Sequence, residues 1–171
     1  MKNKIKNSGF TLIELMVTLA IATILITVAI PGFRTLIQGN RATAQSNELL
    51  SAFSLARSEA VKRGLRVSVC SSTDQATCAA STNWATGWIV FTDDTGTAGT
   101  MDGTDEIIRV WDALNGLTLT GTTNNVQFLG SGLVNAGSTL TLTPTDCTGN
   151  QRRTLSITAV GRASISDTAC P

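Results

Sequence analysis

The sequence predicts an α+β protein in which a long N-terminal helix packs on an antiparallel β-sheet head. Residues 12–30 form an almost wholly apolar run, and residues 42–60 repeat apolar side chains at steps of three and four, which marks one face of a helix. From Leu65 onward, apolar and polar residues alternate between Gly, Asn and Asp, as in short strands joined by turns. A helix followed only by strands favours the α+β class.

The apolar run LIELMVTLAIATILITVAI is long enough to cross a membrane, since such a stretch spans about 28 Å as a helix. Three lysines among the first six residues place the start of the run on the cytoplasmic side. We expect one helix of about fifty residues that is kinked at Pro31 and ends near Gly64. Two helices separated between Pro31 and Gly39 are the alternative.

About seven short strands are expected beyond Leu65, in the stretches LRVSVC, GWIVFTD, DEIIRVWD, GLTLT, NVQFLG, STLTLTP and RRTLSITAVGRASIS. We expect Trp84, Trp88 and Trp111 to be buried in this head, because aromatic side chains dominate burial. Stacking of these rings on nucleic-acid bases is the alternative.

The composition argues against several classes of enzyme. The chain has neither His nor Tyr, which removes the commonest general base, the commonest zinc ligand and every Ser-His or Cys-His nucleophile pair. The net charge is +1, but loss of the three N-terminal lysines would leave ten basic against twelve acidic side chains. Bulk charge therefore gives no argument for a nucleic-acid partner. We expect a protein without enzymatic activity and without a cofactor.

Four cysteines, Cys70, Cys78, Cys147 and Cys170, predict two disulfides in an exported protein. Their spacing is not that of a metal site, so we predict no metal site there, and three pairings remain open. We favour Cys70–Cys78 and Cys147–Cys170, because each bridge would close a local loop. A catalytic thiol is not expected, since no His lies in the chain to lower its pKa.

The start of the chain resembles the type IV prepilin signature. The motif GFTLIEL follows a short basic leader and opens the apolar run. The resemblance implies a membrane peptidase that cuts between Gly9 and Phe10 and then methylates the new N-terminal amine. A secretory signal peptide and a plain membrane anchor fit less well, because no A-x-A site follows the run and Glu14 would stay unexplained.

Glu14 stands inside the apolar run, where a carboxylate needs a partner cation. Cleavage before Phe10 creates an α-amino group that is cationic at neutral pH, about one helical turn away. This amine can belong to the same chain or to a neighbouring subunit. The family resemblance implies the second arrangement, in which Glu14 sets the register between subunits. Removing one partner of a buried ion pair costs roughly 3–5 kcal/mol.

The order of elements narrows the resemblance to the GspH/FimT-type minor pilins and pseudopilins. The stretches LLSAFSLARSEAVKRGLRVSVC, GWIVFTDD and DEIIRVW carry it. The pilin fold that this implies divides the chain into a leader peptide (1–9), a transmembrane or filament-core helix (10–31), an amphipathic helix (32–64) and a β-rich globular head (65–171).

The loop DDTGTAGTMDGTDE carries the acidic residues Asp93, Asp94, Asp102, Asp105 and Glu106. We expect a solvated hairpin loop in which Asp and Gly form the turns. Calcium binding by the clustered carboxylates is the alternative, although their spacing is not that of an EF-hand.

Arg152, Arg153 and Arg162 are the candidate contacts to DNA. A DNA-uptake branch of the pilins has a Gly-Arg-x-Arg motif near its C-terminus, and the stretch GRAS that begins at Gly161 keeps only the first arginine. Three cations on an acidic body would bind phosphates weakly. The favoured interpretation is therefore a set of strand-edge charges that keep the sheet soluble.

These features predict a structural subunit, a minor type IV pilin that helps to prime pilus assembly and connects tip components to the shaft, with roles in adhesion and twitching motility. A type II secretion minor pseudopilin and a DNA-binding competence pilin are the alternatives. The expected partners are other major and minor pilins, a tip adhesin complex, the prepilin peptidase and the inner-membrane assembly platform. We expect a single-pass protein of a Gram-negative-type inner membrane, its head in the periplasm, that later enters the extracellular pilus.

Overall fold

The computed structural model describes residues 10–94 and 96–171, apart from the side chains of Val28 and Pro31. Gly9 and the rest of the expected leader lie outside the described residues. The description therefore covers the expected mature chain but not the residue after which cleavage is predicted.

The chain forms two compact units, Met1–Ile37 and Gln38–Pro171, and the second is named the head below. One helix, α1 (Leu12–Arg63), belongs to both units and has 52 residues. It continues through Pro31 without a break in its helical assignment, so the alternative of two separate helices is wrong. The kink at Pro31 stays a prediction.

The end of α1 follows the sequence pattern closely. Gly64 takes a left-handed φ of +67°, and its N–H donates to the Ala60 carbonyl at 2.9 Å, which is the usual way a glycine closes a helix. In the last turn Glu59 pairs with Arg63 at 2.7 Å and with Lys62 at 3.5 Å. The hydrogen bond from Arg63 holds the pKa of Glu59 below its ordinary value.

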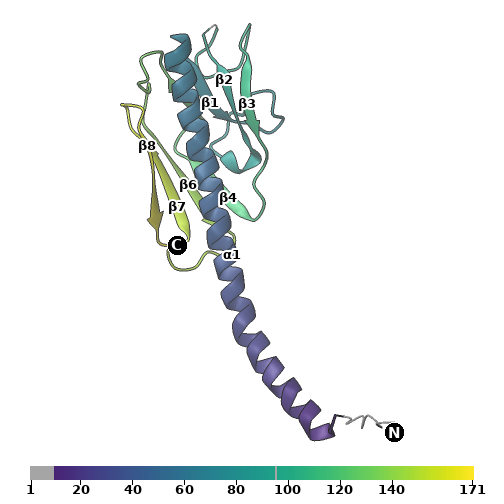
Figure 1. Cartoon of the computed structure of the whole chain (residues 1–171). Coiled ribbons are helices and arrows are strands. Elements are labelled where there is room, and N and C mark those ends of the chain that lie inside the picture. Colours follow the sequence, from purple (N-terminus) through teal and green to yellow (C-terminus); the bar gives the residue numbers. More distant parts are fainter. Residues whose placement is uncertain (1–9, 95) are drawn as a thin grey trace, which may run out of the picture. The chain divides into compact units, whose positions relative to one another are not determined.

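The described part of the head contains eight strands in two antiparallel four-stranded sheets (Figure 1). Sheet A has the order β3-β2-β1-β5 and sheet B the order β4-β6-β7-β8. The strands of sheet A are β1 (Val67–Ser71), β2 (Trp88–Thr92), β3 (Ile107–Trp111) and β5 (Asn125–Phe128). Those of sheet B are β4 (Leu117–Gly121), β6 (Ser138–Pro144), β7 (Arg152–Ile157) and β8 (Ala163–Thr168), and a short 3-10 helix, η1 (Trp84–Thr86), precedes β2.

Two expectations for the strands need correction. The sequence predicts about seven strands, but its last stretch forms two, because the chain turns at Gly161 with a φ of +75° and β8 pairs back on β7. The sequence also predicts a single sheet. The strands instead separate into two sheets, because β6 pairs with β4 and β7 rather than with β5.

The core of the head forms where α1 meets both sheets. The helix contributes four alanines and two larger side chains at helical spacing, all buried: Ala42, Leu49, Ala52, Phe53, Ala56 and Ala60. Phe53 lies 6.1 Å from Trp84 and 6.4 Å from Phe128, measured between ring centroids. The small alanines let strand side chains approach the helix closely, so one helix face fills the core of the head.

The two sheets are buried differently. In sheet B the apolar residues Leu140, Leu142, Leu155 and Ile157 alternate with threonines and serines, so one face meets the core. In β1 and β2 every residue is buried, because the side chains of the other face, Cys70, Ile89 and Phe91, form a second apolar cluster against which Cys78 and Met101 from the loops pack. Sheet A is therefore the inner layer, between α1 and the loops beyond it.

Candidate assembly site at the start of the helix

The start of α1 is held by reciprocal hydrogen bonds between Thr11 and Glu14. The Glu14 backbone N–H donates to Thr11 Oγ1 at 3.3 Å, and the Thr11 N–H donates to Glu14 Oε2 at 3.5 Å. This arrangement is a capping box, in which each residue satisfies the other's free N–H group. The pattern T-x-x-E is present in the sequence and could have predicted this cap, which gives Thr11 a role beside that of Glu14.

The cap leaves most of the Glu14 carboxylate unsatisfied. The one hydrogen bond that it accepts from a described residue is long, its side chain is exposed, and it forms no ion pair within the described ranges. A carboxylate at the first turn also meets the positive end of the helix dipole. The geometry therefore leaves Glu14 able to accept a cation from outside this part of the chain.

The first half of α1 presents an apolar surface on every side. All side chains described between Phe10 and Ile37 are exposed, and Phe10 itself is 81% exposed. Water-soluble proteins rarely expose apolar surface on this scale. By length and composition, α1 contains a segment able to cross a membrane, and a membrane or a set of neighbouring helices would cover this surface.

Three threonines in the apolar half bond their hydroxyl groups to the backbone of their own helix. Thr18, Thr23 and Thr27 donate to backbone carbonyls three residues earlier, at 2.9, 2.8 and 2.8 Å. A hydroxyl bonded to its own helix costs less to place in an apolar medium than a free one. These threonines are therefore compatible with burial in lipid or in a helix bundle.

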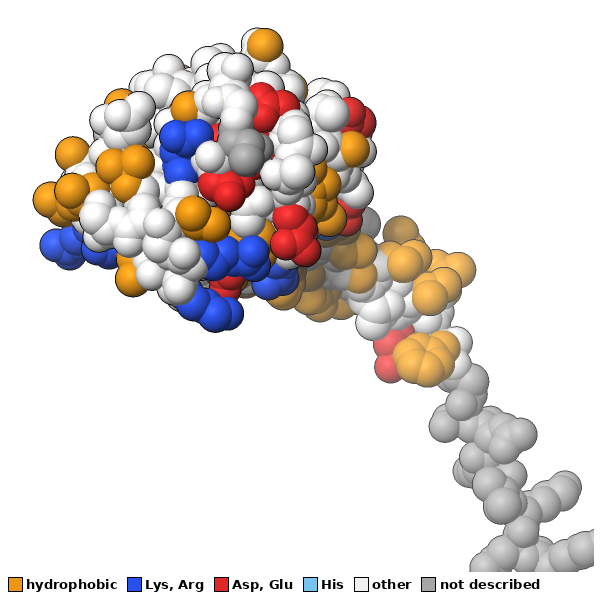
Figure 2. Space-filling view, turned by 90° about the horizontal axis from the view of Figure 1, so that it is seen from above, with side chains coloured by type: hydrophobic (Ala, Val, Ile, Leu, Met, Phe, Trp, Pro, Cys, Tyr) orange, Lys and Arg blue, Asp and Glu red, His pale blue; other side chains and the backbone are white. Residues whose placement is uncertain are grey.

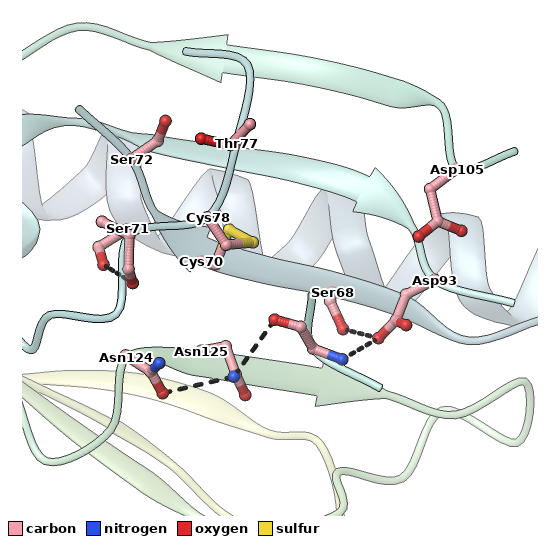
Figure 3. The surroundings of a disulfide bond; sticks show 12 residues. Ser68, Cys70, Ser71, Ser72, Thr77, Cys78, Asp93, Asp105, Asn124 and Asn125 are labelled. Carbon is pink, nitrogen blue, oxygen red and sulfur yellow. Dashed lines mark hydrogen bonds between the residues drawn. A yellow bond between two sulfur atoms is a disulfide. The ribbon is translucent and has the colours of Figure 1, made fainter. Parts of the chain in front are cut away.

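The structure contains the two disulfides that the sequence favours, Cys70–Cys78 and Cys147–Cys170. Figure 3 shows the first of them beside β1, where it ties the loop after the strand back to sheet A. Cys70 is fully buried with Ile89 in the second apolar cluster. This bridge therefore belongs to the packing of the head and not to a reactive thiol pair.

Asp74 organises the loop that the first disulfide closes. Its carboxylate accepts from the N–H groups of Ala76 and Thr77 at 2.9 and 2.8 Å, and from the hydroxyls of Thr77 and Ser72 at 2.7 and 3.1 Å. These bonds, with the Thr77 hydroxyl first, hold the pKa of Asp74 far below its ordinary value. The pattern D-x-x-T at Asp74–Thr77 is typical of such a turn and could have predicted these hydrogen bonds.

Asp93 is not part of a solvated loop, and that expectation is corrected. It is fully buried and accepts from the Ser68 hydroxyl and from the Gly99 N–H, the latter at 2.9 Å. Arg66 pairs with it at 3.2 Å. Figure 3 shows Asp93 pointing at Ser68 across neighbouring strands. A buried carboxylate needs such partners, so Asp93 anchors the loop to sheet A.

Two further acidic residues of this loop serve turns, and Glu106 pairs with Arg63 at 3.6 Å. Asp102 accepts from the Thr97 N–H at 2.9 Å, and Asp105 accepts from the Asp102 N–H at 3.1 Å. Asp94 is exposed. No group of three or more His, Cys, Asp or Glu side chains able to hold a metal ion occurs in the described ranges, so the geometry there supports turns in this loop and gives calcium no support.

The three C-terminal arginines do not share one surface. Arg152 and Arg153 are adjacent in β7 and so point to opposite faces of sheet B. Arg153 pairs with Asp167 at 3.1 Å and donates to Thr43 Oγ1 on the helix at 3.2 Å. Arg162 lies beside α1, in a groove described below. Contact with DNA through these residues stays a prediction.

The tryptophans are buried, as the sequence predicts. Trp84 and Trp88 are at most 1% exposed, and Trp111 stacks on Trp88 with 6.0 Å between ring centroids. Trp84 donates its indole N–H to the Thr123 carbonyl at 2.9 Å. Rings in these positions cannot stack on nucleic-acid bases without unfolding the head.

The two structural regions correspond to two protein-family matches. A family model described as "Type II transport protein GspH" matches residues 45–161, which is most of the head. The chain belongs to the GspH family. A second model, the "Prokaryotic N-terminal methylation motif", matches residues 4–30. Proteins of this type are structural pilin and pseudopilin subunits that assemble with other pilins, and the motif together with the apolar helix indicates membrane anchoring in a pilus system.

Solved structures with the same fold include minor pilins and pseudopilins. The type IV minor pilin FimU of Pseudomonas aeruginosa has a TM-score of 0.58 at 20% identity, over 74% of this chain and 89% of that one. The minor pseudopilin EpsH from the Type 2 Secretion System of Vibrio cholerae has a TM-score of 0.51 at 16% identity, over 74% and 97%. At these identities the likeness shows the pilin-like α+β fold alone. No curated protein sequence matches this GspH-family chain significantly.

Proposed function

We propose that this GspH-family chain is a minor type IV pilin that helps to prime pilus assembly and connects tip components to the shaft. One observation carries the proposal: a prepilin methylation motif opens a helix half whose described side chains are all exposed and mostly apolar. Such a helix must be covered by lipid before assembly and by other pilin helices after it. The two disulfides support a head in the oxidising periplasm, as in a Gram-negative envelope.

In this proposal the prepilin peptidase cuts after Gly9 and methylates the amine of Phe10. Glu14 then receives the amine of a neighbouring subunit, because the capping box leaves its carboxylate open to a cation. An unpaired carboxylate in an apolar medium is costly, so a subunit that docks in the correct register is favoured. Other pilins, a tip adhesin complex and the inner-membrane assembly platform are the proposed partners.

The test is a Glu14→Ala variant of the full chain, expressed from its own locus. Processing, scored as the mobility shift on leader removal, should remain normal, whereas the amount in sheared filaments should fall at least about tenfold, since losing one partner of a buried pair costs roughly 3–5 kcal/mol. Glu48→Ala is the matched control, because Glu48 is an exposed glutamate on the head part of α1. Wild-type incorporation of Glu14→Ala would refute the register role.

A type II secretion minor pseudopilin is the second candidate, favoured by the description of the matching family. Deleting the gene separates the two functions. Loss of surface pili and twitching with normal export of secreted enzymes supports the pilus function, and the opposite result supports secretion. Loss of DNA uptake alone would support the competence pilin, for which only Arg152, Arg153 and Arg162 offer candidate contacts.

A further inference from the structure

A groove of about 810 Å³ lies in the head between α1 and the turn that joins β7 to β8. Phe53, Arg57 and Val61, spaced four residues apart, line it from the helix. Gly161 and Arg162 line it from the turn.

The groove carries positive charge without a carboxylate in its lining. Arg57, Lys62 and Arg162 are its charged residues. Lys62 shares Glu59 with Arg63, and neither Arg57 nor Arg162 forms an ion pair with a residue in the described part of the chain. The mature chain as a whole is acidic by count, so this is a local departure from the overall charge.

The Arg57 guanidinium is held against the turn by one hydrogen bond. Its Nη2 donates to the Val160 carbonyl at 3.2 Å. A Cβ on Gly161 would lie 2.1 Å from the Gly132 carbonyl oxygen and 3.1 Å from Arg57 Nε, so only glycine lets the turn pack this closely. A guanidinium held by its surroundings loses little freedom when it binds a carboxylate.

The groove also has an exposed apolar side chain in its lining. Val61, on the helix, is 54% exposed. Figure 2 shows Lys and Arg side chains gathered along one border of the head, with hydrophobic side chains beside them. A ligand that matches this surface combines carboxylates with at least one apolar side chain.

We propose that this groove docks an acidic segment of a neighbouring pilin subunit, with carboxylates on Arg57 and Arg162 and an apolar side chain on Val61. The proposal rests on the proposed function, since it needs a filament neighbour. Guanidinium groups bind carboxylates through paired, charge-assisted hydrogen bonds. Nucleic acid fits less well, because a groove with three cations on an acidic body neutralises few phosphates.

The experiment places a photo-reactive amino acid at Ser58, a groove residue, in the full chain in cells that assemble the filament. Cross-links are compared in the unsubstituted chain, in Arg162→Gln, in Arg57→Gln/Arg162→Gln and in the control Arg41→Gln, whose exposed arginine lines a different cavity. We expect an adduct with a second protein that carries the N-terminal methylation motif, mapped to a peptide rich in Asp or Glu. Its yield should fall about tenfold in the double variant, less in Arg162→Gln, and not in Arg41→Gln.

Each other outcome overturns the proposal. An adduct whose yield ignores both arginines, one that maps to a peptide without carboxylates, or one with DNA would show a different use of the groove. If the chain is present in filaments but gives no adduct, the docking proposal is refuted and the proposed function is not. Absence of the chain from filaments would refute the proposed function, and the docking site with it. Because the Arg162 side chain makes no described hydrogen bond, Arg162→Gln keeps the test independent of a folding defect in Arg57→Gln.

Discussion

The two halves of α1 have the same backbone conformation but different surroundings. Between residues 10 and 37 every described side chain is exposed, whereas from Ala42 to Ala60 one helix face is fully buried in the head. The second half therefore buries its apolar face against other parts of the chain, whereas the apolar side chains of the first half stay exposed. Because apolar surface must leave water, the first half requires an environment that the chain itself does not supply.

The same contrast separates two carboxylates that cap backbone N–H groups. Asp74 accepts four hydrogen bonds inside the head, between 2.7 and 3.1 Å. Among the described residues, Glu14 accepts one hydrogen bond, at 3.5 Å. A carboxylate that is satisfied within its own chain contributes to folding, whereas one left open can contribute to assembly. Substitutions in the head should therefore change stability, and substitutions in the first half should change incorporation.

The largest effect on stability is expected from Phe53→Ala. Phe53 is 1% exposed and packs on Trp84 and Phe128, so its loss should lower the unfolding free energy of the head by about 3–5 kcal/mol. Urea denaturation of the full chain in detergent, followed by tryptophan fluorescence, measures it. Phe33→Ala, at a 65% exposed position of the first half, should stay within about 0.5 kcal/mol. Equal shifts in the two variants would contradict the comparison.

Removal of the disulfides should rank next. Chain entropy alone predicts losses of about 2.5 kcal/mol for the bridge that spans 8 residues and about 3.4 kcal/mol for the one that spans 23. We expect the reverse order, with a larger loss of unfolding free energy for Cys70→Ala/Cys78→Ala than for Cys147→Ala/Cys170→Ala, because Cys70 also packs on Ile89 and Phe91. Neither pair of substitutions should affect leader removal. A larger loss for the Cys147–Cys170 variant would show that loop length outweighs packing.

The smallest effect concerns the pH dependence of the head. The pKa of Asp74 is lowered in the folded state from its ordinary value of 3.8, so the unfolded chain binds the proton first as pH falls. The stabilisation by Asp74 is therefore complete above about pH 4 and declines below it. Asp74→Asn should flatten the dependence of the unfolding free energy on pH between about 4 and 2, measured by the same denaturation. Asp94→Asn, at an exposed position, is the control and should keep the wild-type slope.

Local patterns predicted much of this molecule because local physics sets those features. The helix has the expected length since its apolar periodicity, the last-turn basic residues and Gly64 all agree. The favoured disulfides occur because each closes a short loop. The strand stretches were found, but their division into two sheets was not, because strand pairing depends on contacts far apart in sequence.

The candidate sites also differ in whether they depend on local sequence or on contacts distant in the sequence. Glu14 stands out in the sequence because a single charge interrupts an apolar run, and that contrast requires no tertiary information. The burial of Asp93 could not be inferred, because its partners Ser68 and Arg66 lie on another strand segment. The groove at Arg57 and Arg162 could not be predicted either, because two residues 105 positions apart in the sequence line one surface.

The sequence by itself determined that this chain has a membrane-compatible helix opened by a prepilin methylation motif and an α+β head with two disulfides, because those properties follow from residue order over short distances. Only the tertiary structure decided how the head closes on one face of α1, which carboxylates it satisfies, and where it leaves guanidinium groups without an ion pair in the described residues. Burial and ion pairing are decided by which distant segments meet, and hydrophobic packing makes that selection for the whole head at once.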